Sequence, residues 1–113
     1  MADGTLYHNP RCSKSRQALE LLQARGLKPQ IVEYLKTPPD EAALKRLLGQ
    51  LGLTAKDVLR RKEAAEAGID AEADEPALIK ALAAHPIALE RPIFVHDGKA
   101  VVGRPPEKVL EIL

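Results

Sequence analysis

The sequence predicts a single α/β domain in which a β–α–β unit and a β–β–α unit contribute strands to one sheet. Three observations support this fold class. Two strand-like runs near the N-terminus are separated by an amphipathic helix pattern, and the whole has the length of a right-handed crossover between parallel strands. A hairpin signal lies near the C-terminus, and a helical block separates the two units. We therefore expect residues 1–113 to form one domain, with a helical insertion of about residues 38–86 between its second and third strands.

The first unit begins with a strand pattern over residues 5–8 (TLYH), which an Asn-Pro pair ends. Apolar residues at helical spacing follow as far as Arg25, and Gly26 is expected just past the helix. The start of this helix has two registers. Either Asn9 is the N-cap and Cys12 lies in the first turn, or Cys12 is the cap itself. Both registers place the sulfur near backbone N–H groups that have no helical partner.

The helical insertion follows a second strand, which is expected over residues 30–35 (QIVEYL). Its helices are expected to begin near residues 37–39, 54–57 and 74–76, the last of them ending before Pro86. Between the second and third of these helices, the Ala- and acid-rich stretch 63–74 is expected to be an exposed connection.

The second unit contains the hairpin signal. Asp97-Gly98 stands between the strand-like runs Ile93–His96 and Lys99–Val102, which fits a two-residue type I′ turn. Residues 103–106 (GRPP) break the second of these strands, and a final helix is expected over residues 107–113.

Composition and charge exclude several classes of function. The formal net charge of +1, from 17 basic and 16 acidic residues, gives no electrostatic basis for binding nucleic acid. No apolar run approaches the roughly 20 residues that span a bilayer, and the N-terminus lacks the features of a signal peptide. A chain with one cysteine cannot form an internal disulfide, so we expect a cytoplasmic protein. Near-neutral charge and the lack of an evident exposed apolar stripe favour a monomer.

The only cysteine, Cys12, is the candidate nucleophile. Its neighbours include the cationic Arg11, Lys14 and Arg16, a poor setting for a buried hydrophobic residue. Positive charge and a helix N-terminus both favour the thiolate. The sequence therefore predicts an activated thiol at the first strand-to-helix junction.

A cysteine at this junction, in a β–α–β plus β–β–α order, fits the thioredoxin and glutaredoxin architecture. The redox signature of that architecture is Cys-x-x-Cys, but here the fourth position is Ser15. Because the resolving thiol is absent, an enzyme of this form needs an external thiol such as glutathione. A Cys-x5-Arg phosphatase loop is also excluded, since position 18 is Ala.

Four further residues are candidates for the same site. Arg60, Arg91 and Arg104 stand far apart in the chain, and guanidinium groups that converge near a thiolate would bind a tetrahedral oxyanion. His8, four residues before Cys12, is either a neighbour that tunes the thiol or a histidine hydrogen-bonded at a strand end. No cluster of His, Cys and carboxylates has metal-ligand spacing, so no metal site is expected.

Together these motifs resemble the glutaredoxin-linked arsenate reductase family, which has a thioredoxin-like fold with a helical insertion. The chain ends at Leu113, where the best-known members continue with a C-terminal tail, so it looks like a shorter branch of that family. The matching segments are residues 7–16 (YHNPRCSKSR), 34–39 (YLKTPP), 59–60 (LR), 85–87 (HPI), 90–93 (ERPI) and 103–106 (GRPP).

The resemblance implies a role for each candidate. Cys12 would be the nucleophile that attacks arsenate, His8 would lie close enough to tune it, and Arg60, Arg91 and Arg104 would bind the anion. No cofactor would be bound, and glutathione would act as co-substrate. Glutathione would reduce the arsenate adduct and leave a cysteine–glutathione disulfide, from which glutaredoxin would restore the thiol.

Two alternative functions use the same fold. The first is a glutathione-dependent thiol transferase or oxidoreductase that acts on another substrate through the same thiolate. The second is an Spx-type regulator that binds RNA polymerase. Regulators of that type often sense redox state through a Cys-x-x-Cys motif, and its absence here argues against this role.

Overall fold

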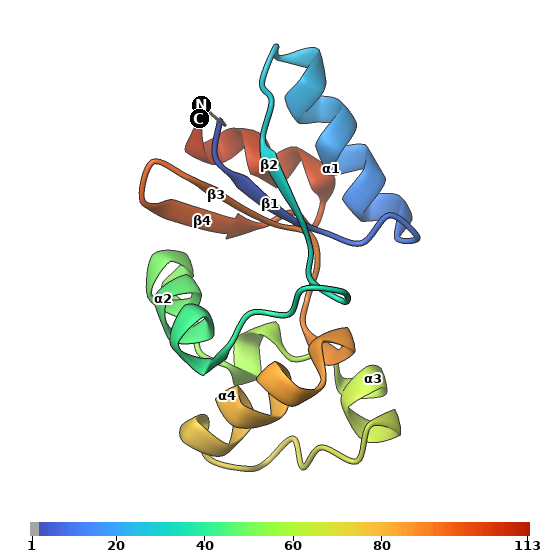
Figure 1. The fold of residues 1–113 in the computed structure, drawn as a ribbon, viewed down its shortest axis with the longest axis vertical. Coiled ribbons are helices and arrows are strands. Elements are labelled where there is room, and N and C mark those ends of the chain that lie inside the picture. The colour runs from blue at the N-terminus through green and yellow to red at the C-terminus, as the bar shows by residue number, and fades with distance from the viewer. Residues whose placement is uncertain (1–2) are drawn as a thin grey trace. The chain divides into compact units, whose positions relative to one another are not determined.

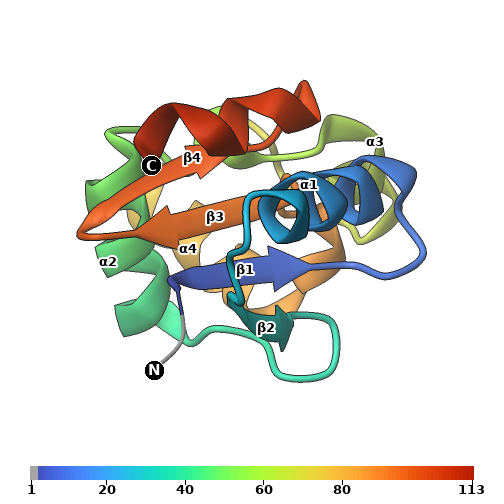
Figure 2. The same cartoon turned by 90° about the horizontal axis from the view of Figure 1, so that it is seen from above.

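The computed structural model describes residues 3–113 and contains one four-stranded sheet with the strand order β2-β1-β3-β4. Its central strand β1 pairs in parallel with β2 and antiparallel with β3, and β3 pairs antiparallel with β4 (Figures 1 and 2). This mixed sheet confirms the predicted α/β, thioredoxin-like fold class. The strands are β1 (Thr5–His8), β2 (Gln30–Glu33), β3 (Ile93–His96) and β4 (Lys99–Val102).

The chain divides into two compact units. One contains the sheet and consists of the residues up to Thr37 together with Arg91–Leu113, and the other is Pro38–Glu90. The second unit contains the helical insertion that the sequence predicts, and it extends a few residues beyond the expected end.

In the first unit, α1 (Ser13–Ala24) and the 3-10 helix η3 (Pro106–Ile112) pack against each other and cover one face of the sheet (Figure 2). Aliphatic side chains from α1 and η3 meet the inward side chains of β1 and β3 there, as the low aromatic content predicts. Burying this apolar surface is the main favourable term for the unit. The fully buried residues of the cluster are Leu6, Ala18, Leu22, Phe94 and Val109.

The hairpin between β3 and β4 has the predicted turn. Asp97 has φ 54° and Gly98 has φ 80°, so both central residues adopt the left-handed conformation that a type I′ turn requires. This turn fixes the register, in which Ile93 lies opposite Val102 and His96 opposite Lys99.

In the second unit, α2 packs on α4, and α3 packs on η2. Asp40 and Asp74 cap α2 and α4, and each accepts a hydrogen bond from the N–H group three residues later. The unit contains α2 (Glu41–Leu51), η1 (Lys56–Val58), α3 (Arg61–Glu66), α4 (Glu75–Ala84) and η2 (Pro86–Ala88).

A short antiparallel bridge joins the middle of the second unit to its end. Leu59 lies opposite Leu89, the Arg60 N–H donates to the Ala88 carbonyl at 2.7 Å, and the Glu90 N–H donates to the Val58 carbonyl at 2.8 Å.

Some expected boundaries were wrong. The stretch 63–74 is not only an exposed connection, because α3 extends to Glu66 and fully buries Ala64. The second strand ends at Glu33 instead of residue 35, since the Glu33 carbonyl accepts hydrogen bonds from the N–H groups of Lys36 and Thr37 in a turn. The first insertion helix begins at Glu41, after its Asp40 cap, and the final helix is a 3-10 helix.

Candidate functional site

The loop after β1 is a tight turn that delivers Cys12 to the start of α1. The Cys12 N–H donates to the Asn9 carbonyl at 3.0 Å, and the Asn9 Oδ1 accepts from the Arg11 N–H at 3.0 Å. The Arg16 Nη1 donates to the Pro10 carbonyl at 2.8 Å and ties the loop to the helix. Cys12 is the N-cap, with φ −91° and ψ 122°, so the later of the two predicted registers is the correct one.

The Cys12 thiol is half-buried, and its surroundings act on its pKa in opposite directions. Burial raises the pKa, because it penalises the charged thiolate. The Ser15 N–H, the Arg91 guanidinium and the Lys14 N–H lower it, and their combined effect leaves the pKa below its ordinary value. The sulfur forms no capping hydrogen bond to α1, so the N–H groups act as partial positive charges close by. The thiol therefore ionises more readily than a free cysteine.

Two of the three candidate arginines lie at this thiol. The Arg104 Nη2 is 3.7 Å from the Cys12 Sγ, and the Arg91 guanidinium lies close enough to the thiol to lower its pKa. The Arg104 Nε donates to the Arg91 carbonyl at 2.8 Å, which fixes one arginine against the backbone of the other. Each of the two is followed by a cis peptide bond to proline. The unit thus brings two guanidinium groups to one half-buried sulfur.

His8 lies at the end of β1 but directs its ring to Ser15. The His8 Nδ1 and the Ser15 Oγ are 2.6 Å apart, and the Ser15 Oγ also accepts from the Asn9 N–H at 3.0 Å. The His8 Nδ1 therefore bonds to Ser15 and not to Cys12. Burial lowers the pKa of His8, the Glu33 carboxylate opposes this shift, and Arg16 adds to it. The ring is therefore held neutral at neutral pH.

Arg60 belongs to the second unit. Its Nε donates to a Glu63 carboxylate oxygen at 2.9 Å, and its Nη1 lies 3.6 Å from a Glu90 carboxylate oxygen. Both carboxylates come from that unit, so the guanidinium is held in a fixed direction by two acidic side chains. Its predicted part in binding the anion stays a prediction.

A hollow of ≈ 270 Å³ lies beside the Cys12 loop within the first unit. Its walls come from the end of β1, the loop itself and the turn after β2, and they carry both signs of charge. The lining residues are His8, Asn9, Pro10, Arg11, Glu33, Leu35 and Lys36.

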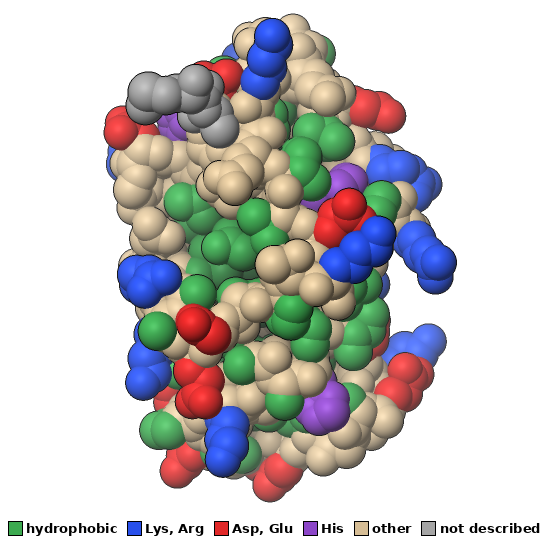
Figure 3. All heavy atoms as spheres, viewed as in Figure 1, with side chains coloured by type: hydrophobic (Ala, Val, Ile, Leu, Met, Phe, Trp, Pro, Cys, Tyr) green, Lys and Arg blue, Asp and Glu red, His purple; other side chains and the backbone are tan. Residues whose placement is uncertain are grey.

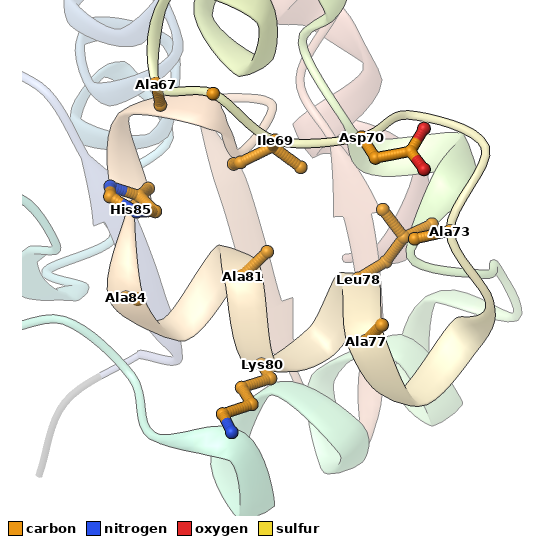
Figure 4. A pocket seen from close by; sticks show the side chains of 11 residues that line it. Ala67, Ile69, Asp70, Ala73, Ala77, Leu78, Lys80, Ala81, Ala84 and His85 are labelled. Atoms are coloured by element: carbon orange, nitrogen blue, oxygen red, sulfur yellow. The ribbon is translucent and has the colours of Figure 1, made fainter.

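The second unit has a larger hollow of ≈ 340 Å³ between α4 and the segment after α3 (Figure 4). Alanine side chains make up much of its wall, and Asp70, Lys80 and His85 lie on different sides of it. Because catalytic sites need polar groups that converge, this hollow is a poor candidate.

Ser15 is the site residue that sequence reasoning did not assign. We considered it only as the missing second cysteine, yet its fully buried hydroxyl bridges the Asn9 backbone and the His8 ring. The signal available in the sequence was the helical spacing, which places Ser15 one turn after Cys12 on the inward face with Ala18 and Leu22.

Within the part of the chain that the structure describes, no three metal-ligating side chains gather into a cluster. None of the helices over residues 3–113 has the length and apolar character to cross a membrane. Basic and acidic side chains are interspersed over the face shown in Figure 3.

Comparisons with known proteins identify the family of this chain and similar solved structures. The ArsC family profile matches residues 7–112, a range that includes Cys12, Arg91 and Arg104. An arsenate reductase of Neisseria meningitidis serogroup A is 47% identical over 117 residues, with 100% of both chains covered. YfgD, an uncharacterized protein of Escherichia coli, is 49% identical over 96% of this chain and 94% of its own length. The solved structure of an arsenate reductase from Vibrio cholerae has a TM-score of 0.88 and 48% identity, and the match covers 96% of each chain.

Proposed function

The chain belongs to the ArsC family, and from this membership we propose that it is an oxidoreductase that reduces arsenate to arsenite. The observation that carries the proposal is the Cys12 thiol, whose pKa is lowered and against which Arg91 and Arg104 lie. Arsenate is a tetrahedral oxyanion, and guanidinium groups bind such oxygens through paired hydrogen bonds. A relative with 47% identity over its whole length carries the name arsenate reductase.

In the first step the Cys12 thiolate attacks the arsenic atom. An arsenic–sulfur bond forms and the bond from arsenic to one hydroxyl oxygen breaks; that oxygen leaves as water, with its own proton and one equivalent to the proton that Cys12 released on ionising. Arg91 and Arg104 neutralise the charge on the remaining oxygens during the attack.

The second step needs a thiol that this chain does not have. The chain has a single cysteine, and the position of a resolving thiol is Ser15, whose hydroxyl is buried against His8 and Asn9. We propose glutathione as the co-substrate that supplies it. The arsenic–sulfur bond breaks, a Cys12–glutathione disulfide forms, and arsenic gains the two electrons that the two sulfurs lose. Arsenite then leaves with its three oxygens.

A thiol of glutaredoxin attacks the glutathione sulfur of the mixed disulfide, so that glutathione becomes disulfide-bonded to glutaredoxin and Cys12 leaves as the free thiolate. Glutathione and glutaredoxin are therefore the proposed partners, with glutathione as a co-substrate and no resident cofactor. This cycle requires a reducing compartment, so we propose that the protein acts in the cytoplasm as part of arsenic detoxification.

Two further residues enter the proposal through the family resemblance. Arg60 is proposed as a third anion-binding arginine. His8 is proposed to tune the site through the Ser15 bridge, since its ring bonds to the hydroxyl of the residue whose N–H lowers the pKa of Cys12.

The test is a coupled assay with purified protein, arsenate, glutathione and glutaredoxin, in which arsenite is measured directly. We expect turnover by the native chain, no turnover by Cys12→Ser and near-native turnover by Ser13→Ala, an exposed neighbour at the first position of α1. Undiminished arsenite formation by Cys12→Ser would refute the nucleophile.

A second arm separates the substrate from the chemistry. If the native chain forms no arsenite but exchanges a glutathione mixed disulfide on a peptide, the protein is a thiol transferase and not an arsenate reductase. If arsenite forms equally well when thioredoxin replaces glutathione and glutaredoxin, the proposed reductants are wrong.

A further inference from the structure

The outer edge of β2 is a strand edge without a partner strand in residues 3–113, because β2 is the first strand in the order β2-β1-β3-β4. Ile31 on this strand is 40% exposed, and hydrophobic side chains are visible on the surface beside β2 in Figure 3. Exposed strand edges pair readily with other chains unless charge, proline or a covering segment prevents it.

The hydrogen bonds to β1 show which backbone groups point outward. The Lys28 carbonyl accepts a hydrogen bond from the Asp3 N–H, and the Gln30 N–H donates to the Gly4 carbonyl. The backbone groups of residues 28 and 30 therefore point toward β1 and the residues that precede it. In this parallel register Val32 faces β1 as well. The alternating residues Pro29, Ile31 and Glu33 therefore direct their backbone groups away from the sheet.

Two of these outward positions lack a usable group. Pro29 has no N–H, and the Glu33 carbonyl already accepts hydrogen bonds from the N–H groups of Lys36 and Thr37 at 2.9 Å each. The edge thus offers the Pro29 carbonyl, both groups of Ile31 and the Glu33 N–H. A partner strand with a full set of N–H and carbonyl groups would have one carbonyl opposite Pro29 and one N–H opposite Glu33 without a partner on this edge.

A second copy of the same edge matches the pattern when the strands run antiparallel about a two-fold axis at Ile31. The Ile31 N–H and carbonyl exchange bonds with Ile31 of the second copy, and the Glu33 N–H donates to Pro29 of the second copy, each in both directions. Pro29, which has no N–H to donate, then lies opposite the Glu33 carbonyl of the second copy, which already accepts hydrogen bonds from its own chain. Every backbone group in the pairing therefore has a partner.

We propose that β2 is a self-association edge, through which two copies of this chain join their sheets into one continuous sheet. The interface is isologous, as expected for a two-fold dimer. It does not depend on the proposed enzymatic function, because the paired edge contains neither Cys12 nor the candidate arginines.

The side chains are compatible with this register. The directly opposed pairs are Ile31 with Ile31, Pro29 with Glu33 and Gln30 with Val32, so no like charges face each other. A hollow of ≈ 330 Å³ lined by Leu19, Leu27, Pro29 and Ile31, among others, adjoins the edge and gives apolar surface for the Ile31 side chain of the second copy. The paired segment is short, so the interface lies at the low end of the size range and the dimer dissociates readily. This proposal departs from the monomer expected from charge and composition.

Sedimentation of the native chain under reducing conditions is the first test, because reduction prevents dimers linked through Cys12. We expect a concentration-dependent dimer between about 10 µM and about 1 mM. Ile31→Lys opposes two like charges at the axis and should weaken association by about tenfold or more. Leu53→Lys is the matched control, since Leu53 is 38% exposed but lies outside the sheet, and it should not change association.

A register test uses the Cys12→Ser background, in which each added cysteine is the only thiol. The two-fold pairing places Gln30 opposite Val32 at about 4.5 Å between Cα atoms, within reach of a disulfide. Gentle oxidation of a mixture of Gln30→Cys and Val32→Cys should give more cross-linked dimer than either variant alone. Equal cross-linking in the mixture and the single variants, a native chain that stays monomeric over the whole range, or a dimer that Ile31→Lys leaves intact would each refute the proposal.

Discussion

The pKa of the Cys12 thiol is set by effects that act in opposite directions. Burial favours the thiol, whereas the Ser15 and Lys14 N–H groups and the Arg91 guanidinium favour the thiolate, and the second group prevails. Burial is the largest single effect on this pKa, and it is outweighed only because the two N–H groups and the guanidinium act together.

We expect the rate of Cys12 alkylation to rise with a midpoint below about pH 8.5, the value for a free thiol. Arg91→Gln removes the positive charge of a guanidinium group that lowers the pKa of the thiol, so it should move the midpoint upward. Arg11→Gln is the control, because Arg11 is exposed and adjacent in sequence but is not among the groups that shift this pKa. A native midpoint at or above 8.5 would contradict an activated thiol.

His8 couples the same loop to pH. Burial lowers its pKa in the folded protein below the value of about 6.5 that the unfolded chain retains. The unfolded state therefore binds more protons below pH 6.5, and the free energy of unfolding should fall as the pH drops from 6.5 toward 5. In urea denaturation, His8→Gln should flatten this dependence, while His85→Gln, an exposed histidine of the insertion, should leave it unchanged. A native chain with equal stability at pH 5 and pH 7 would refute the coupling.

Residue types near Cys12 were sufficient to predict a thiol with a lowered pKa, and the Arg-Pro pairs pointed to Arg91 and Arg104. Their convergence on the sulfur could not be predicted, because it depends on the hairpin returning β3 beside β1. The bridge through Ser15 was missed for a similar reason: a serine in a helix is usually exposed, and only the loop conformation turns its hydroxyl to His8.

At the scale of elements, the insertion helices depend on their aspartate caps. The Asp40 Oδ1 accepts from the Ala43 N–H at 2.8 Å, which satisfies one of the N–H groups left open at the start of α2. We expect Asp40→Ala to lower the free energy of unfolding by about 1 kcal/mol and Asp40→Asn to retain most of the stability. Glu41→Ala, one residue later and without a capping bond, is the control in the same urea titration. Equal losses for Asp40→Ala and Asp40→Asn would show that charge, not the capping bond, matters.

Segments that combine regular apolar spacing with turn or cap residues were predicted well, whereas segments without these features were not. The strands of the hairpin, α1, α2 and α4 combine apolar spacing with turn or cap residues, and the structure has each of them. The six-residue α3 was missed because its sequence, RKEAAE, is polar nearly all round and has Ala64 as its one buried residue. β2 ends early because backbone hydrogen bonds to the Glu33 carbonyl form a turn, and no side-chain pattern in the sequence indicates this turn.

At the scale of the whole molecule, Arg60 tests whether the insertion takes part in the proposed reaction. Arg60→Gln should raise the KM for arsenate by about tenfold, the loss expected for one charged hydrogen bond to an anion, with a smaller effect on kcat. Arg61→Gln, the exposed neighbour at the start of α3, should leave both constants near their native values. If the two variants behave alike, the insertion does not supply an anion-binding arginine.

The bridge between Leu59 and Leu89 joins two segments of the insertion, so the hydrogen bonds of this bridge belong to the second unit alone. Every hydrogen bond of the four-stranded sheet lies in the other unit, so Pro38–Glu90 can unfold locally without breaking one. The bridge N–H groups of Arg60 and Glu90 then exchange with solvent deuterium together, at a rate set by this local opening. The N–H groups that bond within β1 and β3 exchange only when the whole sheet comes apart. Exchange rates should therefore change between residues 37 and 38 and again between residues 90 and 91.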